Sequence, residues 1–169
     1  MAQPADFDIE ALYEALDAQR VARGMSWQEV AGAISDPFRD GPARPISAST
    51  LTGMRGRSVV EGDGVLQMLR WLRRTPESFI PGHEATAPLP EVRPGQILRF
   101  DTRRLYEAVD ARRIERGMTW RAVAGEIPGV GVASLSRLSK GGRTGFPQVS
   151  RLARWLGLPL ASFTRAADR

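Results

Sequence analysis

The segment TWRAVAGEIPGVGVASLSRL, which runs from Thr119 to Leu138, decides how this chain of 169 residues is organised. In its first half, apolar residues recur three and four positions apart, as they do on one face of an α-helix, and Thr119 precedes them as a natural N-cap. A short turn at residues 128–131 follows and contains two glycines. A second apolar pattern begins at Val132, with Leu135 and Leu138 expected to face inward. The segment therefore predicts two helices joined by a tight turn.

An internal duplication extends this pattern to most of the chain. Residues Phe7 to Ile34 align with Phe100 to Ile127 at a constant offset of 93, and 17 of the 28 positions are identical. The similarity resumes at an offset of 84, where it pairs Leu51 with Leu135 and Arg70-Trp71-Leu72 with Arg154-Trp155-Leu156. The first copy carries nine extra residues between Ile34 and Ile46. Two related units are therefore expected.

Each unit is expected to form five short helices, so we predict an all-α fold of two tandem domains. Gly24 and Gly117 are expected to end the first helices, and Ser26 and Thr119 to cap the second. In the first unit, Ser47 is expected to cap a third helix from Ala48 to about Arg55, and Asp63 a fourth. Pro147 is expected near the start of the fourth helix of the second unit, and Pro76 and Pro159 at the start of the last helices. Residues 81–96 contain four prolines and no apolar periodicity, which indicates a linker. The predicted domains are residues 1–80 and 97–169, and the linker leaves their relative orientation open.

Composition narrows the function classes. The chain has no cysteine and a single histidine, His83, which argues against a metal site, and we expect no cofactor. The sequence has no run of apolar residues long enough for a membrane span, and its start, Met1 to Pro4, does not resemble a signal peptide, so a cytoplasmic protein without a membrane partner is expected. Residues 1–95 carry a net charge of −3 and residues 96–169 a net charge of +8. The basic second half favours a polyanionic partner.

The paired helices resemble the helix-turn-helix regulators of the lambda-repressor and Cro-like type, often called the xenobiotic-response-element family. The resemblance rests on residues 119–138 in the second unit, and on Ser26 to Ile34 with Ile46 to Met54 in the first. It implies five-helix domains in which the third helix lies in the major groove of duplex DNA. The implied function is a sequence-specific transcriptional regulator of repressor type, located at the nucleoid, with the second unit as the main DNA reader.

The resemblance also implies site residues. The positions implied to read bases are Val132, Ala133, Ser136 and Arg137 in the second unit, and Ala48, Ser49 and Thr52 in the first. Arg137 is the strongest candidate, because a guanidinium can donate two hydrogen bonds to guanine O6 and N7. The implied phosphate contacts are Thr119, Arg121, Ser134, Lys140 and Arg143, with Arg55 and Arg57 in the first unit.

Several alternatives stay open at this point. The first unit departs from the family pattern, since an insertion at residues 35–45 replaces the tight turn between its second and third helices. A homodimer formed through this unit would bring two DNA-reading units together and so restore bivalent binding. Alternatively, the unit is an antitoxin-like adaptor whose insertion grips a protein partner through Phe38. The four tryptophans fit helical periodicity and favour core packing over base stacking, and no catalytic constellation is present, so an enzyme is not expected.

Overall fold

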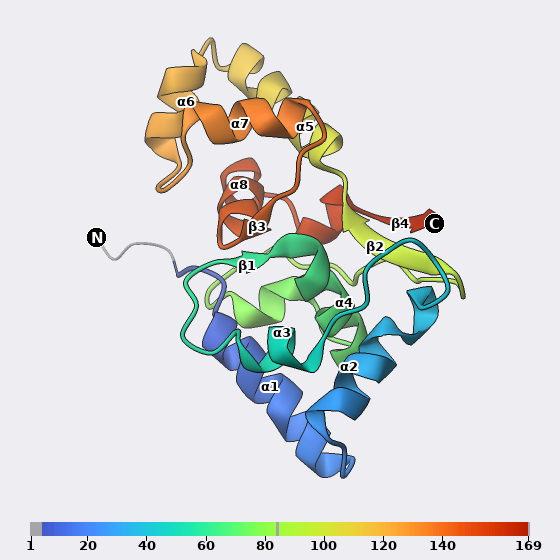
Figure 1. The fold of residues 1–169 in the computed structure, drawn as a ribbon. Coiled ribbons are helices and arrows are strands. Elements are labelled where there is room, and N and C mark those ends of the chain that lie inside the picture. The colour runs from blue at the N-terminus through green and yellow to red at the C-terminus, as the bar shows by residue number, and fades with distance from the viewer. Residues whose placement is uncertain (1–4, 84, 169) are drawn as a thin grey trace.

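The computed structural model describes residues 5–83 and 85–168. Met1 to Pro4, on which the expectation about a signal peptide rests, lie outside these ranges. The described chain is mostly helical, with 54% of it in helices, and it also contains two small antiparallel sheets (Figure 1). The prediction of an all-α fold is therefore wrong. None of the helices in the described ranges is both long and apolar enough to cross a membrane.

The two repeats share an order of four helices, a short strand and a closing 3₁₀ turn, to which the first adds η1 and the second adds β2 and β4. The first repeat contains α1 (Ile9–Ala22), α2 (Trp27–Ser35), a 3₁₀ turn η1 (Asp36–Phe38), α3 (Ala48–Thr52), β1 (Val60–Glu61), α4 (Gly62–Leu72) and η2 (Pro76–Phe79). The second begins with β2 (Gln96–Phe100) and continues with α5 (Thr102–Glu115), α6 (Trp120–Glu126), α7 (Val132–Ser139), β3 (Gly145–Phe146), α8 (Gln148–Leu156), η3 (Leu160–Phe163) and β4 (Thr164–Asp168). The expected last helices are thus short 3₁₀ turns, and α3 ends three residues before Arg55.

Local capping accounts for most helix ends. Ser26 Oγ accepts a hydrogen bond from the backbone N–H of Glu29, whose side chain accepts one from the Ser26 N–H in return, which forms a capping box. After α1, Gly24 has a φ of 63°, and the N–H of Met25 donates to the carbonyl of Arg20. This left-handed glycine ends the helix as the sequence predicted, and Gly117 does the same after α5.

The two sheets join segments that are far apart in sequence. β1 pairs with β3, opposing Glu61 to Gly145, and β2 pairs with β4 along all five residues of each strand. Sequence patterns missed these strands for a physical reason. β1 and β3 have only two residues each, β4 carries small and polar residues in place of a strong β pattern, and β2 begins inside the segment interpreted as a linker.

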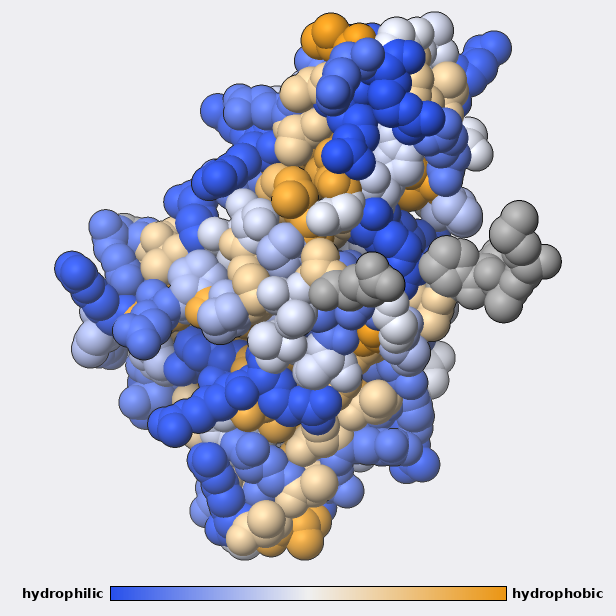
Figure 2. Space-filling view, turned by 180° about the vertical axis from the view of Figure 1, so that it is seen from behind, coloured by the Kyte–Doolittle hydropathy of each residue, from blue (hydrophilic) through white to orange (hydrophobic). Residues whose placement is uncertain are grey.

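One hydrophobic core runs through both repeats. Leu12, Leu51 and Leu69 of the first repeat belong to the same buried cluster as Leu105 and Leu152 of the second. At its centre, the ring of Phe146 lies 4.3 Å from the ring of Phe7 and 5.8 Å from that of Phe100, measured between centroids. The orientation of the two repeats, which the linker left open, is therefore set by their shared core. Around this core, the rear surface is largely hydrophilic, and hydrophobic residues show only in small patches (Figure 2).

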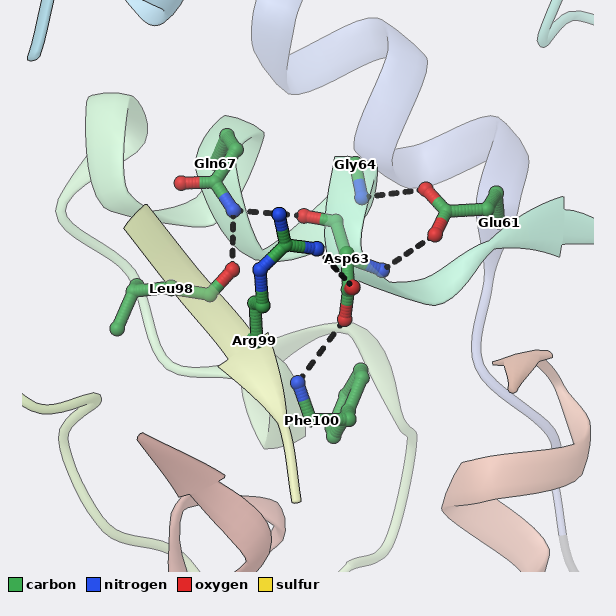
Figure 3. A network of polar contacts seen from close by, with 7 residues as sticks. All are labelled: Glu61, Asp63, Gly64, Gln67, Leu98, Arg99 and Phe100. Carbon is green, nitrogen blue, oxygen red and sulfur yellow. Dashed lines mark hydrogen bonds and ion pairs between the residues drawn. The ribbon is translucent and has the colours of Figure 1, made fainter. Parts of the chain in front are cut away.

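Polar contacts at the start of α4 strengthen this junction (Figure 3). The carboxylate of Glu61 accepts hydrogen bonds from the N–H groups of Asp63 and Gly64, so Glu61 caps α4. The prediction that Asp63 is this cap is wrong. Asp63 instead accepts a hydrogen bond of 2.9 Å from the N–H of Phe100 and pairs with Arg99 on β2. The helix and strand of different repeats are thereby held together.

The insertion of the first repeat is folded back onto the protein. Ser35 Oγ accepts a hydrogen bond of 2.9 Å from the N–H of Ile46, which closes the base of the loop. Near its tip, Phe38 is 1% exposed and packs with Ile97 and Ala167 on the second sheet. Phe38 is therefore an internal anchor for β2 and β4, and its ring is not available to grip a protein partner.

Candidate nucleic-acid interface

The candidate reading head is formed by α6, a tight turn and α7. Thr119 Oγ1 accepts a hydrogen bond of 3.1 Å from the N–H of Ala122 and caps α6, as predicted. After α6, the chain reverses at Gly129, which has a φ of 73°, and buried Val130 returns it to the core. α7 then packs against both α5 and α6. This support leaves one side of α7 free.

Burial divides α7 into two faces. Leu135 and Leu138 are 1% and 3% exposed and attach the helix to the core. The four residues implied to read bases all lie on the other face and are exposed: Val132, Ala133, Ser136 and Arg137. The guanidinium of Arg137 has one hydrogen bond, to Ser134 Oγ at 3.4 Å, which is long. The outer face of α7 thus carries small side chains at the start of the helix and one guanidinium, that of Arg137, a turn later.

Basic side chains gather at the end of α7. α7 ends at Ser139, and in the turn that follows the N–H of Gly142 donates to the carbonyl of Arg137. The side chain of Arg103, from α5, lies directly beside Gly141. Lys140 and Arg143 are exposed in the same segment. α5 therefore adds a cation to this end of α7, and sequence reasoning did not include Arg103 among the site residues.

The other implied phosphate contacts of the second repeat differ in their exposure and in whether their polar atoms are already hydrogen-bonded. Arg121 is exposed on the first turn of α6. Ser134 is half-buried, and Thr119 already uses its oxygen to cap α6. Backbone N–H groups at the start of α7 lack a side-chain cap, because its N-cap is Gly131. These N–H groups and Arg121 are thus the freest donors near the start of the reading head.

The equivalent surface of the first repeat is less open. α3 has only five residues, with Ser49 and Thr52 exposed and Ala48 half-buried. Thr52 Oγ1 donates to the carbonyl of Ala48, so its hydroxyl hydrogen is used within the helix. The guanidinium of Arg55 lies 3.5 Å from Glu10 Oε1 and over the ring of Tyr13. Arg57, by contrast, is exposed, and within the described residues its side chain makes no hydrogen bond or ion pair.

A recess between α6 and α8 distinguishes the second repeat. In the first repeat, Arg70 on α4 donates a hydrogen bond of 2.8 Å to the carbonyl of Ile34 and closes α2 onto α4. Its counterpart Arg154 donates instead to the carbonyl of Ala5. A recess of about 230 Å³ remains, lined in part by Ile127 and Trp155. α6 is therefore held less closely to α8 than its counterpart α2 is to α4.

Glu126 bridges the rim of this recess. Both of its carboxylate oxygens accept hydrogen bonds of 2.8 Å from Arg116, and the indole N–H of Trp155 donates a third. These contacts, with that of Arg116 the largest, lower the pKa of Glu126 from 4.5 to about 2. The carboxylate therefore ties α6 to both α5 and α8.

A pH titration tests this bridge. Because the pKa of Glu126 is lower in the folded state, its stabilising effect is present above about pH 4.5 and is lost as the pH falls towards 2. We expect the carboxyl carbon of Glu126, followed by NMR, to titrate near pH 2. The Glu126→Gln variant identifies the signal, and Arg116→Met should move the midpoint upwards. A midpoint near 4.5 in the unchanged protein would show that the bridge is absent in solution.

The sequence contained a signal for the basic surface that the motif analysis did not use. Between Glu126 and Asp168 the chain has no acidic residue, and this interval includes all of α7 and α8. Positive potential at the end of α7 is therefore not neutralised by acids from α7 itself or from β3, α8 and η3, which follow it. No cluster of possible metal-binding His, Cys, Asp or Glu side chains occurs within the described ranges.

Comparisons with known proteins do not add a family to this geometry. No protein-family model, curated protein or solved structure matches the chain. The resemblance to helix-turn-helix regulators and the roles it implies for individual residues thus stay predictions.

Proposed function

We propose that the protein binds duplex DNA in a sequence-specific manner as a transcriptional regulator of repressor type, with the second repeat as its main reader. The observation that carries the proposal is the division of α7 into a buried face with Leu135 and Leu138 and an exposed face with Arg137. A helix held in this way can enter the major groove, which is about 12 Å wide, without losing its attachment to the core. A regulator of this kind works in the cytoplasm, on the nucleoid.

The side chains of the exposed face suit close approach to base edges. Val132 and Ala133 are small and apolar, which permits contact with a thymine methyl group. Ser136 adds a hydroxyl that can donate or accept a hydrogen bond. Arg137 can donate two parallel hydrogen bonds to guanine, and within the described residues its guanidinium makes only the long hydrogen bond to Ser134. Little internal bonding has to be broken before this side chain contacts DNA.

The surrounding charge supports the same proposal. Arg103 and Lys140 stand at one end of α7, and Arg121 is exposed on the first turn of α6. Cations beside a reading helix can contact the phosphate backbones that border a major groove. Release of counterions from these phosphates makes the expected affinity strongly dependent on salt.

The adaptor alternative is not favoured by the structure. Its suggested contact, Phe38, is buried against the second sheet. The first repeat is also joined to the second through a continuous core, so it does not present a separate domain surface at this point.

Substitution of Arg137 tests the proposal. Duplexes are first selected by the full chain from a library with a random core, and their dissociation constants are then measured with the full chain and its variants. Arg137→Ala should weaken binding by about 1–3 kcal/mol and relax the preference at one base pair. Arg165→Ala, which removes the same charge from an exposed position on β4, is the matched control and should keep the preference. A uniform loss of affinity for all sequences with Arg137→Ala would instead assign Arg137 to a phosphate, and failure to enrich any duplex would refute DNA binding.

A further inference from the structure

We propose that one chain acts as a built-in dimer and reads two unlike half-sites in inverted orientation on the same duplex. This inference rests on the proposed DNA binding and specifies the kind of DNA sequence recognised. Its basis is that the two repeats meet through contacts that are repeated about a local two-fold axis.

The first sign of the axis is the β1–β3 ribbon. Glu61 and Gly145 are equivalent positions of the two repeats, separated by the offset of 84, and they oppose each other directly in the antiparallel ladder. Only a two-fold rotation between the strands can place a residue opposite its own equivalent in this way. The ribbon therefore marks where the axis passes.

The second sign is a reciprocal exchange of the segments that precede α1 and α5. Residues Ala5 to Phe7 correspond to Leu98 to Phe100 at the offset of 93. In the first exchange, Gln67 on α4 donates to the carbonyl of Leu98. In the second, the counterpart of Gln67 on α8, Arg151, binds both carboxylate oxygens of Asp6 at 2.7 and 2.8 Å.

The aromatic contacts follow the same rule. Phe7 packs on Phe146 of the other repeat. Its equivalent, Phe100, lies against Gly62, which is the counterpart of Phe146. A third pair of equivalents, η2 and η3, also contact each other. Each repeat thus places its leading segment on the fourth helix of the other, as two subunits of a symmetric dimer would.

We expect the axis to relate the two candidate reading helices as well. In Figure 1, α3 and α7 lie on opposite sides of the β1–β3 ribbon, and so do α2 and α6. Two reading helices related by a two-fold axis match a duplex whose half-sites are inverted, because the local two-fold axes of B-DNA are perpendicular to its own axis. A direct repeat would require one helix to be turned around, which the shared core opposes.

The two half-sites must differ because the reading faces differ. Arg137 and Ser136 of α7 have as their counterparts Gly53, the C-cap of α3, and Thr52, its last residue. α3 therefore lacks the forked cation and should specify its half-site more weakly. No second chain is needed for bivalent binding, since the reciprocal contacts are already made within one molecule.

The selection with the full chain tests this inference. We expect the recovered duplexes to contain a strong and a weak half-site, inverted about a constant centre. Reversing the weak half-site in a synthetic duplex should reduce affinity at least about tenfold. Arg137→Ala should relax only the strong half-site and Thr52→Val only the weak one. Native mass spectrometry should find one chain per duplex.

The outcomes separate this inference from the proposed function. Recovery of a single half-site, equal affinity for the direct and inverted arrangements, or two chains per duplex would overturn the built-in dimer while leaving DNA binding intact. If no duplex is enriched, both the proposed function and this inference fail. Thermal unfolding of each variant, compared with the unchanged chain, shows whether a loss of binding reflects lost reading or lost folding.

Discussion

Replacement of Phe146 by Ala is expected to lower the free energy of unfolding by about 3–5 kcal/mol, the largest loss from any single substitution considered for this protein. Phe146 is fully buried, and its ring contacts Phe7 of one exchanged segment and Phe100 of the other. The substitution removes both contacts and leaves a cavity where the two repeats meet. Urea unfolding followed by circular dichroism measures the loss.

The design of this experiment separates a junction effect from a general one. Ile114→Ala, at a side chain that is 64% exposed, is the control and should change the free energy of unfolding by less than about 0.5 kcal/mol. The unchanged chain should unfold in a single transition, because its core is continuous. Two well-separated transitions in the unchanged chain would contradict the shared core. In Phe146→Ala, a first transition that exposes only one repeat would show that Phe146 couples them.

Replacement of Phe38 by Ala is expected to have the second largest effect on stability. It should lower the free energy of unfolding by no more than about 3–5 kcal/mol. Phe38 is 1% exposed and is the largest residue of the small cluster that supports β2 and β4. Its loss should expose the backbone amides of these strands to hydrogen exchange before those of α4. Hydrogen exchange measured residue by residue checks this order.

The same substitution decides between two interpretations of the insertion. If Phe38 anchors the sheet, the exchange of β2 and β4 rises and stability falls. If Phe38 instead served a protein partner, stability and exchange would remain unchanged. Pro42→Ala, at an exposed position of the same loop, is the matched control and should leave the exchange of both strands as it is.

Local signals predicted the helices well because their causes lie within a few residues. The caps Ser26 and Thr119 bond to N–H groups three positions away, and Gly24 and Gly117 supply the positive φ that ends α1 and α5. The inward positions of α7 followed from the spacing of Leu135 and Leu138 alone. The same spacing leaves Arg137 off the inward-facing positions, which predicts that it is exposed.

The misses share a different cause. The cap of α4 was predicted to be Asp63. Asp63 instead accepts a hydrogen bond from the N–H of Phe100, 37 positions later, and Glu61 caps the helix. The strands were missed because pairing between Glu61 and Gly145 leaves no periodic pattern in a two-residue segment. Arg103 was left out of the site because only the packing of α5 brings it beside Gly141.

The sequence by itself determined that the chain contains two copies of one helical unit, where α2, α3 and α6 begin, where α1 and α5 end, and which face of α7 is free. These properties depend on interactions within one or two helical turns, which periodicity and capping residues encode directly. Only the tertiary structure decided that the copies share a core and exchange their leading segments. Contacts such as that of Asp6 with Arg151 join residues 145 positions apart, so they arise from the matching of folded surfaces rather than from any local pattern.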